Sequence, residues 1–296
     1  MSIFIDENTK VVVQGIGSQG TFHAKRNQDY GTKVVAGTHP KKGGTTWEPL
    51  GVPVLGTVEE AVENEGANTS MVMVPAPFTK AAILEAYEAG IETIIAITEG
   101  VPVHDMTEVY DTVVRKGGVR LLGPNCPGLI SPGKANVGII PPDITKPGNV
   151  GLVSRSGMLT YQIMHELAQA GIGISTCVGI GGDPIIGTQF LDVIKAFAED
   201  PETEAIAFVG EIGGREEQKA GEWINANIPH TPVVGYIAGF EAPEGKQMGH
   251  AGAIVKEGGE GGESAADKKE ILGELGIPVA VNPSECAQLM IERLNR

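Results

Sequence analysis

The sequence is poor in cysteine and lacks long apolar runs. Its three cysteines, Cys126, Cys177 and Cys286, form neither a CxxC pair nor a Cys/His cluster at metal-ligand spacing. The absence of such a cluster predicts no metal site. An odd number of cysteines is typical of reduced thiols, which predicts a cytoplasmic protein. No stretch of eighteen apolar residues occurs, and the acidic start MSIFIDENTK is unlike a secretory signal. We therefore expect neither a targeting segment nor a membrane-spanning one.

Positive charge is also scarce. The chain has 22 Lys and Arg against 37 Asp and Glu, a formal net charge of -15. Binding to nucleic acid or to an anionic membrane surface would add repulsion, so neither partner is expected. Any anionic ligand must instead be held locally, by backbone N–H groups at helix N-termini and by a few lysines.

Short β-branched runs alternate with amphipathic stretches, which predicts parallel strands joined by crossover helices. Helices are expected at 58–65, 80–89 and 105–116. Strands are expected at 11–14, 33–37, 71–74, 93–98 and 119–123, and again at 150–154, 174–180, 204–210, 232–239 and 277–281.

A Pro- and Gly-rich segment, 131–149, separates the two series of strands. This break favours two doubly wound α/β domains over one eight-stranded barrel. The predicted domains are 1–130 and 149–296, joined by a linker at 131–148. A Gly/Glu-rich stretch, 256–269, is predicted to be a mobile surface loop.

The first candidate site is a glycine-rich turn, Gly15-Ile16-Gly17-Ser18-Gln19-Gly20, which follows the first predicted strand and opens a helix. Such a turn lets a pyrophosphate approach the backbone, although the same pattern also occurs in plain strand-to-helix turns. An NAD site would place an acidic residue about twenty residues further on. Here Lys41 and Lys42 follow instead, which indicates a phosphorylated ribose, as in NADP or CoA, or else a solvated lysine pair. The loops expected to line the cleft are 74–77, 98–100 and 123–126.

The second candidate site combines a helix start with a histidine. Ser154-Arg155-Ser156-Gly157 follows a predicted strand and opens a helix, whose N-terminus favours anions. His250 lies among small residues in Gly249-His250-Ala251-Gly252, and a neutral imidazole is a competent nucleophile toward phosphorus. Glu211 is the candidate to hold its other nitrogen. A glycine-flanked histidine without a catalytic role is the alternative.

The chain carries five further motifs, GPNCPG at 123–128, VSRSG at 153–157, GIGGDP at 179–184, GEIGG at 210–214 and GKQMGHAGAI at 245–254. Through these motifs, and over essentially its whole length, it resembles the α subunits of succinyl-CoA synthetases, also called succinate–CoA ligases. The resemblance implies a Rossmann-like CoA-binding domain followed by a flavodoxin-like ligase domain. It also implies that His250 is transiently phosphorylated, that Glu211 supports it, and that the helix start at 154–157 binds the phosphohistidine.

The resemblance and the loop positions together give the predicted ligand contacts. Tyr161 matches a substrate contact. The predicted CoA contacts are Gly15, Gly17, Ser18, Gln19, Gly20, Lys42, Pro75, Ile97, Thr98, Glu99, Asn125 and Cys126.

The resemblance further implies a β subunit of ATP-grasp fold that binds ATP or GTP with Mg²⁺, in an αβ heterodimer or an α₂β₂ heterotetramer. The sequence departs from the family in two places. The first glycine loop is one residue shorter, and Met158 and Gln162 stand where Thr and Glu are usual, so malate is an alternative acid to succinate. An NADP-dependent oxidoreductase and a non-catalytic CoA-sensing module are the alternatives of other classes.

Overall fold

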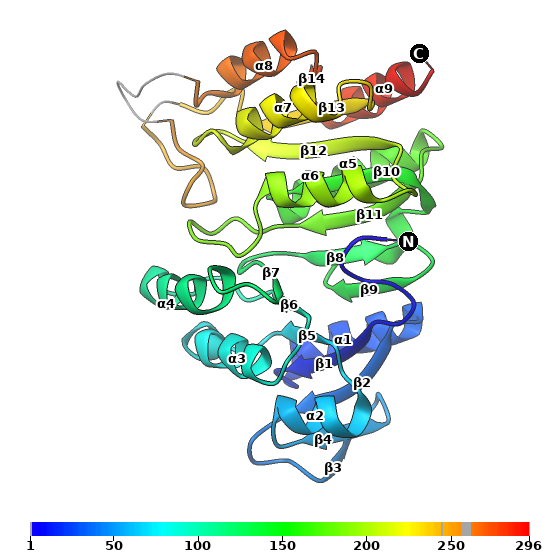
Figure 1. Cartoon of the computed structure of the whole chain (residues 1–296), viewed down its shortest axis with the longest axis vertical. Coiled ribbons are helices and arrows are strands. Elements are labelled where there is room, and N and C mark those ends of the chain that lie inside the picture. The colour runs from blue at the N-terminus through cyan, green and yellow to red at the C-terminus, as the bar shows by residue number, and fades with distance from the viewer. Residues whose placement is uncertain (1, 244, 256–261, 296) are drawn as a thin grey trace. The chain divides into compact units, whose positions relative to one another are not determined.

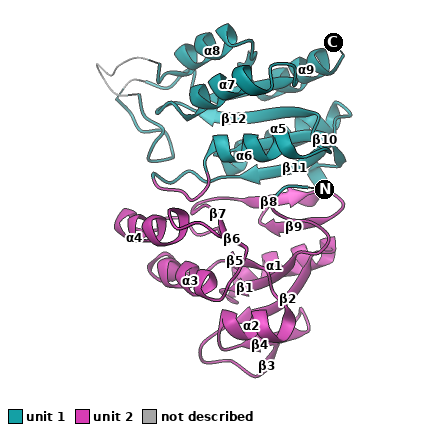
Figure 2. Cartoon of the chain, in the orientation of Figure 1, with its two compact units in different colours: residues 1–3, 143–184, 189–296 teal, residues 4–142, 185–188 magenta. Residues whose placement is uncertain are grey.

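The structure is a computed structural model that describes residues 2–243, 245–255 and 262–295. The chain divides into two compact units (Figure 2). Unit 1 comprises residues 1–3, 143–184 and 189–296, and unit 2 comprises residues 4–142 and 185–188. Each unit is built on a mostly parallel sheet with helices, which confirms the predicted α/β class. Among the described residues, no helix combines the length and the apolar character needed to cross a membrane.

Unit 2 contains a sheet in the order β3-β4-β2-β1-β5-β6-β7. Only the edge strand β3 is antiparallel, and the remaining order is that of a Rossmann sheet, 3-2-1-4-5-6. The strands predicted in this half are all present, whereas β3 and β4 were not predicted. Their bounds are β1 Lys10–Gln14, β2 Lys33–Thr38, β3 Thr45–Trp47, β4 Val52–Leu55, β5 Thr69–Val72, β6 Thr93–Ala96 and β7 Arg120–Leu122.

The helices of unit 2 are α1 Ser18–Tyr30, α2 Val58–Glu65, α3 Ala76–Glu88 and α4 Val103–Val109, the last continued by a π-helical turn η1 Tyr110–Val114 (Figure 1). Helix α2 shows how local sequence sets the bounds. The Thr57 hydroxyl accepts the backbone N–H of Glu60 at its start, and Gly66 ends it with a φ of 69°. The central strands are buried on both faces, as parallel strands covered by helices must be.

The Pro/Gly-rich region after β7 contains regular structure. Strands β8 Gly128–Ser131 and β9 Ala135–Gly138 pair as an antiparallel hairpin, and a 3₁₀ turn η2 follows at Pro142–Ile144. A Cβ on Gly128 would lie 2.1 Å from the Val137 carbonyl oxygen, so this pairing needs a glycine there. The hairpin packs on α1, where the Asn27 amide donates to the Gly138 carbonyl over 3.1 Å.

The strands of unit 1 run in the order β14-β13-β12-β10-β11, and all are parallel. Numbered along the chain this order is 2-1-3-4-5, the flavodoxin-like arrangement. Every strand predicted for this half is present. Their bounds are β10 Pro147–Ser154, β11 Ile174–Gly179, β12 Ala205–Glu211, β13 Val233–Ala238 and β14 Val279–Ala280.

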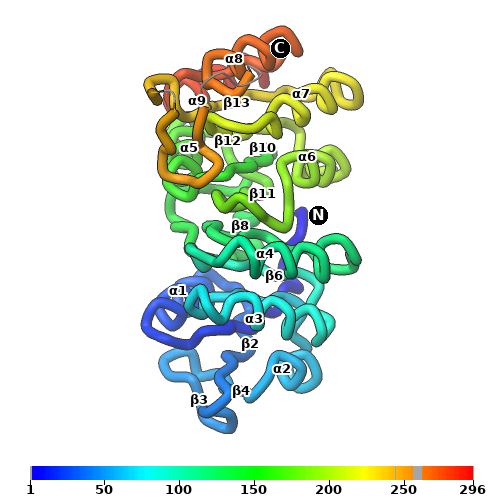
Figure 3. Tube along the Cα trace, turned by 90° about the vertical axis from the view of Figure 1, so that its left-hand side faces the viewer, coloured from blue at the N-terminus to red at the C-terminus, as the bar shows by residue number. Residues whose placement is uncertain are grey.

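Helices cover both faces of these strands. In the rotated view, α5 Gly157–Gln169 and α9 Pro283–Leu294 lie on one face, and α6 Phe190–Glu199 and α7 Glu216–Asn227 lie on the other (Figure 3). Helix α8 Ala265–Glu274 packs on α7. In the core between the layers, Phe190 of α6 and Phe208 of β12 meet edge to face with ring centroids 6.3 Å apart.

The prediction of a mobile loop at 256–269 is wrong for its last residues. Residues 256–261 lie outside the described residues, but 265–269 form the first turns of α8. The reason is local: the Ser264 hydroxyl accepts the Asp267 N–H over 3.1 Å, and the Asp267 carboxylate accepts the Ser264 N–H over 3.3 Å. This capping box starts a helix directly after the glycine-rich run.

Candidate active site

The sheet of unit 1 brings two predicted site residues to one edge. Strands β10 and β12 are parallel neighbours, with Ser154 opposite Val209. The backbone N–H of Arg155 continues the ladder by donating to the Val209 carbonyl over 3.3 Å. Because parallel strands share their carboxyl edge, Arg155 and Glu211 leave the sheet side by side.

The loop that carries His250 is closed on itself and lies against the turn after Glu211. Backbone hydrogen bonds join Gly245 to Val255 and Met248 to Ala253 over 2.9 and 2.8 Å. At the turn, Gly213 has a φ of 86°, and a Cβ there would lie 2.1 Å from the Gly252 carbonyl oxygen. Only glycine permits this approach, which places the histidine loop directly over the carboxylate.

His250 and Glu211 form a close pair. The imidazole Nδ1 lies 2.6 Å from Glu211 Oε2, and the two side chains are 22% and 10% exposed. A carboxylate accepts the Nδ1 proton, so the neutral ring keeps its lone pair on Nε2. The ring lies against bare backbone, because a Cβ on Gly182 would come within 2.5 Å of Nε2.

The surroundings raise the pKa of His250 above its ordinary 6.5. The hydrogen bond to Glu211 is the largest cause of this raised pKa, and the charges of Glu211 and Asp183 add to it. Partial burial and the charge of Arg155 oppose the shift. The carboxylate therefore stabilises the imidazolium form, which is the charge that develops when the ring attacks an electrophile.

Arg155 connects this pair to the start of α5. Its Nη1 lies 3.7 Å from Glu211 Oε1. Arg155 Nε and Glu211 Oε1 are buried without a hydrogen-bond partner among the described residues, which is typical of a site that accepts a ligand. Ser156 caps α5, with Gly157 at its first position, so the helix presents its N-terminal N–H groups here.

The first site lies in unit 2, at the edge where the sheet order reverses between β1 and β5. A pocket of about 570 Å³ opens there. It contains the predicted residues Gly15, Gly17 and Pro75, and it is lined by Gln14, Gly15, Ile16, Gly17, Thr38, His39, Pro40, Gly56, Val74, Pro75, Phe78, Ala81, Ala82 and Glu85. Ligands of such sheets bind at this switch point.

Glycine is required in the turn at the pocket. Gly15 has a φ of 112°, and a Cβ there would lie 2.6 Å from the Met73 carbonyl carbon. A Cβ on Gly20 would lie 1.8 Å from the Gly15 carbonyl oxygen. The turn is therefore packed tightly against the backbone that follows β5, and Ser18, Gln19 and Gly20 form the first turn of α1 beside the pocket.

Other predicted contacts lie along the same edge of the sheet. The Thr98 hydroxyl donates to the Val74 carbonyl over 2.7 Å, and the Asn125 N–H donates to the Thr98 carbonyl over 2.9 Å. This chain of contacts places Ile97, Thr98, Glu99, Asn125 and the buried Cys126 beyond Val74, outside the pocket lining. Lys42 lies in the exposed turn after β2, two residues past the lining residue Pro40.

Sequence reasoning missed the contribution of α3 to this pocket. Glu85 accepts a hydrogen bond from the Gln14 side chain over 3.0 Å and one from the Val58 N–H over 3.1 Å. Phe78, on the same helix, is 62% exposed at the pocket. No motif marks these residues, because only the strand order brings α3 next to β1.

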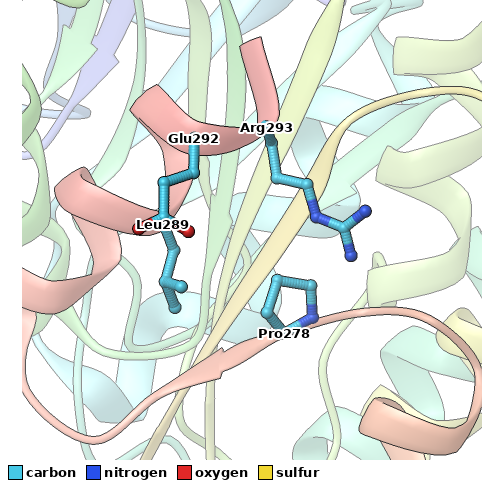
Figure 4. A pocket seen from close by; sticks show the side chains of 4 residues that line it. All are labelled: Pro278, Leu289, Glu292 and Arg293. Atoms are coloured by element: carbon cyan, nitrogen blue, oxygen red, sulfur yellow. The ribbon is translucent and has the colours of Figure 1, made fainter. Parts of the chain in front are cut away.

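A smaller cavity of about 210 Å³ lies between β14 and α9 (Figure 4). It is lined by Pro278, Leu289, Glu292 and Arg293. The Arg293 guanidinium donates a hydrogen bond to the Gly276 carbonyl, so this positively charged lining residue is already bound to the protein backbone. The described residues contain no group of three or more His, Cys, Asp or Glu that could hold a metal ion.

Comparison with known families matches both parts of the chain. The CoA binding domain family matches residues 6–100, and the CoA-ligase family matches residues 153–273. The ADP-forming succinate–CoA ligase subunit alpha 2 of Archaeoglobus fulgidus is 56% identical over 295 residues, 99% of this chain and 100% of the relative. The corresponding subunit alpha of Staphylococcus aureus is 53% identical over 293 residues, 99% of this chain and 95% of the relative.

Solved structures show the same fold. The ATP citrate lyase of Methanothrix soehngenii, solved with citrate and coenzyme A, aligns with a TM-score of 0.87 at 24% identity. The alignment covers 99% of this chain and 50% of the lyase chain, so this chain spans about half the length of that protein.

Proposed function

Because the chain belongs to the family of succinate–CoA ligase α subunits, we propose that it is the α subunit of an acid–CoA ligase in which His250 carries a phosphoryl group. The observation that carries this proposal is the 2.6 Å contact between His250 Nδ1 and Glu211, at the sheet edge next to the start of α5. This contact orients a nucleophilic nitrogen, and the helix N-terminus beside it suits an anion.

The proposed reaction has three balanced steps. The Nε2 lone pair of His250 attacks the γ-phosphorus of a nucleoside triphosphate, and the nucleoside diphosphate leaves. A carboxylate oxygen of the acid then takes the phosphoryl group and frees the histidine. Finally the thiolate of CoA attacks the acyl carbon, and inorganic phosphate leaves. Succinate is the proposed acid.

The residues of unit 1 have distinct parts in these steps. Glu211 holds the Nδ1 proton and stabilises the positive ring after attack. Arg155 and the N–H groups of Ser156 and Gly157 at the start of α5 stabilise the phosphoryl oxygens, and Ser154 ends the strand that leads into this turn. Tyr161, on the next turn of α5, is the proposed contact to the acid.

The pocket of unit 2 is proposed to bind CoA. Its glycine turn suits the pyrophosphate, and its apolar walls suit the adenine ring. Residues 1–130 are the proposed CoA-binding domain and 149–296 the ligase domain, with 131–148 connecting them. The proposed contacts remain Gly15, Gly17, Ser18, Gln19, Gly20, Lys42, Pro75, Ile97, Thr98, Glu99, Asn125 and Cys126.

A separate β subunit completes the proposed enzyme. It supplies the ATP-grasp fold that binds ATP or GTP with Mg²⁺, in an αβ heterodimer or an α₂β₂ heterotetramer in the cytoplasm. This proposal is supported by the names of the relatives, which are subunits alpha.

The complex with a β subunit tests the function directly. We expect γ-labelled ATP or GTP to label the α chain at His250, with the site located by peptide mass spectrometry under alkaline conditions. The label should leave His250 when the acid is supplied, CoA should then release it as inorganic phosphate, and a panel that includes succinate and malate should identify the acid. A chain that takes no label in an assembled complex would contradict the proposal.

The Lys42→Ala substitution tests CoA recognition. We expect the KM for CoA to rise about tenfold, since one charge-assisted contact to a phosphate is lost. The KM for 3'-dephospho-CoA should change little, because that analogue lacks the phosphate that Lys42 is proposed to bind. Lys33→Ala is the matched control, because Lys33 starts β2, the strand that precedes Lys42, and its ammonium donates to the Glu7 carbonyl. An equal rise in the KM for CoA and in the KM for 3'-dephospho-CoA would exclude this role for Lys42.

A further inference from the structure

A buried lysine outside the proposed site is bonded to the backbone of Glu211. Lys268, on α8, is 0% exposed. Its ammonium donates to the Glu211 carbonyl over 2.7 Å, to the Gly213 carbonyl over 2.8 Å and to Glu217 Oε2 over 2.5 Å. An ammonium has three donors, so all of them are satisfied, and two hold the turn that follows Glu211.

Glu217, on α7, holds the same turn from its other side. It is 2% exposed, and its Oε1 accepts the backbone N–H of Glu211 over 3.2 Å. A Cβ on Gly210 would lie 2.5 Å from this Oε1, so a glycine in β12 makes room for the carboxylate. The Lys268–Glu217 pair therefore binds both the N–H and the C=O of Glu211.

We propose that Lys268 and Glu217 are positioning residues, which fix the backbone of residues 211–213 so that the Glu211 carboxylate meets His250 Nδ1. The inference rests on the proposed role of Glu211 and His250 and adds two residues that touch neither the ring nor a substrate. A buried ion pair contributes little net stability compared with apolar residues of similar size. The Lys268–Glu217 pair makes two hydrogen bonds to the backbone of Glu211, and these restrict Glu211 to one conformation.

The influence of the pair reaches the imidazole through the backbone of residues 211–213, which carries the Glu211 carboxylate and contacts the His250 loop at Gly213. The charged groups that act on His250 are Glu211 at the end of β12, Arg155 after β10 and Asp183 after β11. Lys268 and Glu217 are paired at 2.5 Å, so their charges offset each other. A change in the pKa of His250 on altering the pair would thus report a disturbed contact between the Glu211 carboxylate and the ring.

The Lys268→Met/Glu217→Gln double variant tests this inference. It removes both buried charges together, which leaves no uncompensated ion in the core, so the variant should fold. In the full chain, NMR titration of the His250 ring should show a lower pKa than in the wild type, shifted in the same direction as in Glu211→Gln. In the complex with a β subunit, kcat should fall about tenfold with the KM for CoA unchanged.

Leu272→Ala is the matched control. Leu272 is a fully buried residue of the same helix, outside the network, so its loss lowers Tm without touching Glu211. We expect this control to titrate at His250 as the wild type does. If the double variant also titrates and turns over like the wild type, or differs only in Tm, the pair has a structural role and the inference is overturned. Failure of the wild type itself to take label at His250 would instead refute the proposed function.

Discussion

Replacing His250 with asparagine is expected to abolish phosphorylation of the chain. Asparagine keeps a polar side chain of similar size but has no lone pair able to attack phosphorus. In the complex with a β subunit, label from γ-labelled nucleotide should fall by about a thousandfold or more, equivalent to about 4 kcal/mol in transition-state stabilisation. Acid-stable and alkali-stable label should be measured separately, because phosphohistidine survives alkali and is lost in acid.

The His230→Asn variant serves as its control. His230 belongs to the same unit, is exposed, and lies in the turn before β13, away from Glu211. It should label and turn over like the wild type. Undiminished alkali-stable label in His250→Asn would place the phosphoryl group on another residue and would remove the basis of the proposed mechanism.

Replacing Glu211 with glutamine is expected to leave the ring in place but lower its reactivity. The amide oxygen can still accept the Nδ1 proton, whereas the negative charge opposite the developing imidazolium is lost. We expect the rate of phosphorylation to fall about a hundredfold, equivalent to about 3 kcal/mol. Single-turnover labelling measures this step without the later ones.

The same substitution has a defined pH signature. The hydrogen bond to Glu211 is the main cause of the raised pKa of His250, so that pKa should fall in the variant. The acidic limb of the labelling rate, which follows loss of the imidazole proton, should therefore move to lower pH. Because folding raises the pKa of His250, its protonated ring stabilises the folded protein. This contribution is fully present below the unfolded-state pKa of 6.5 and is lost as the pH rises through the folded-state pKa.

Unfolding measurements test this linkage independently of activity. The wild type should have a higher free energy of unfolding than Glu211→Gln below pH 6.5. This difference should shrink as the pH rises through the folded-state pKa of His250. Glu216→Gln is the control, because among the residues that the structure describes Glu216 pairs only with the exposed Lys219 on its own helix. A pH-independent difference between wild type and Glu211→Gln would show that the carboxylate does not set the protonation of the ring.

The two sites differ in how far local sequence could describe them. The glycine turn at Gly15–Gly20 and the helix start at Ser154–Gly157 are local features, and both were predicted and are present. Lys41 and Lys42 fitted NADP and CoA equally, because a ribose phosphate is common to both. The match of residues 6–100 to the CoA binding domain family decides for CoA.

The sequence alone determined the alternation of strands and helices, and hence the α/β class, because apolar periodicity and β-branched runs act over a few residues. It also indicated His250 and Glu211 as candidates, yet nothing local placed them together. Their contact depends on the adjacency of β10 and β12 and on the glycine at 213. The hairpin at 128–138, the α3 wall of the pocket and the Lys268–Glu217 pair were decided by tertiary structure alone. Each is held by hydrogen bonds or packing between residues far apart in the chain, which no short stretch of sequence can specify.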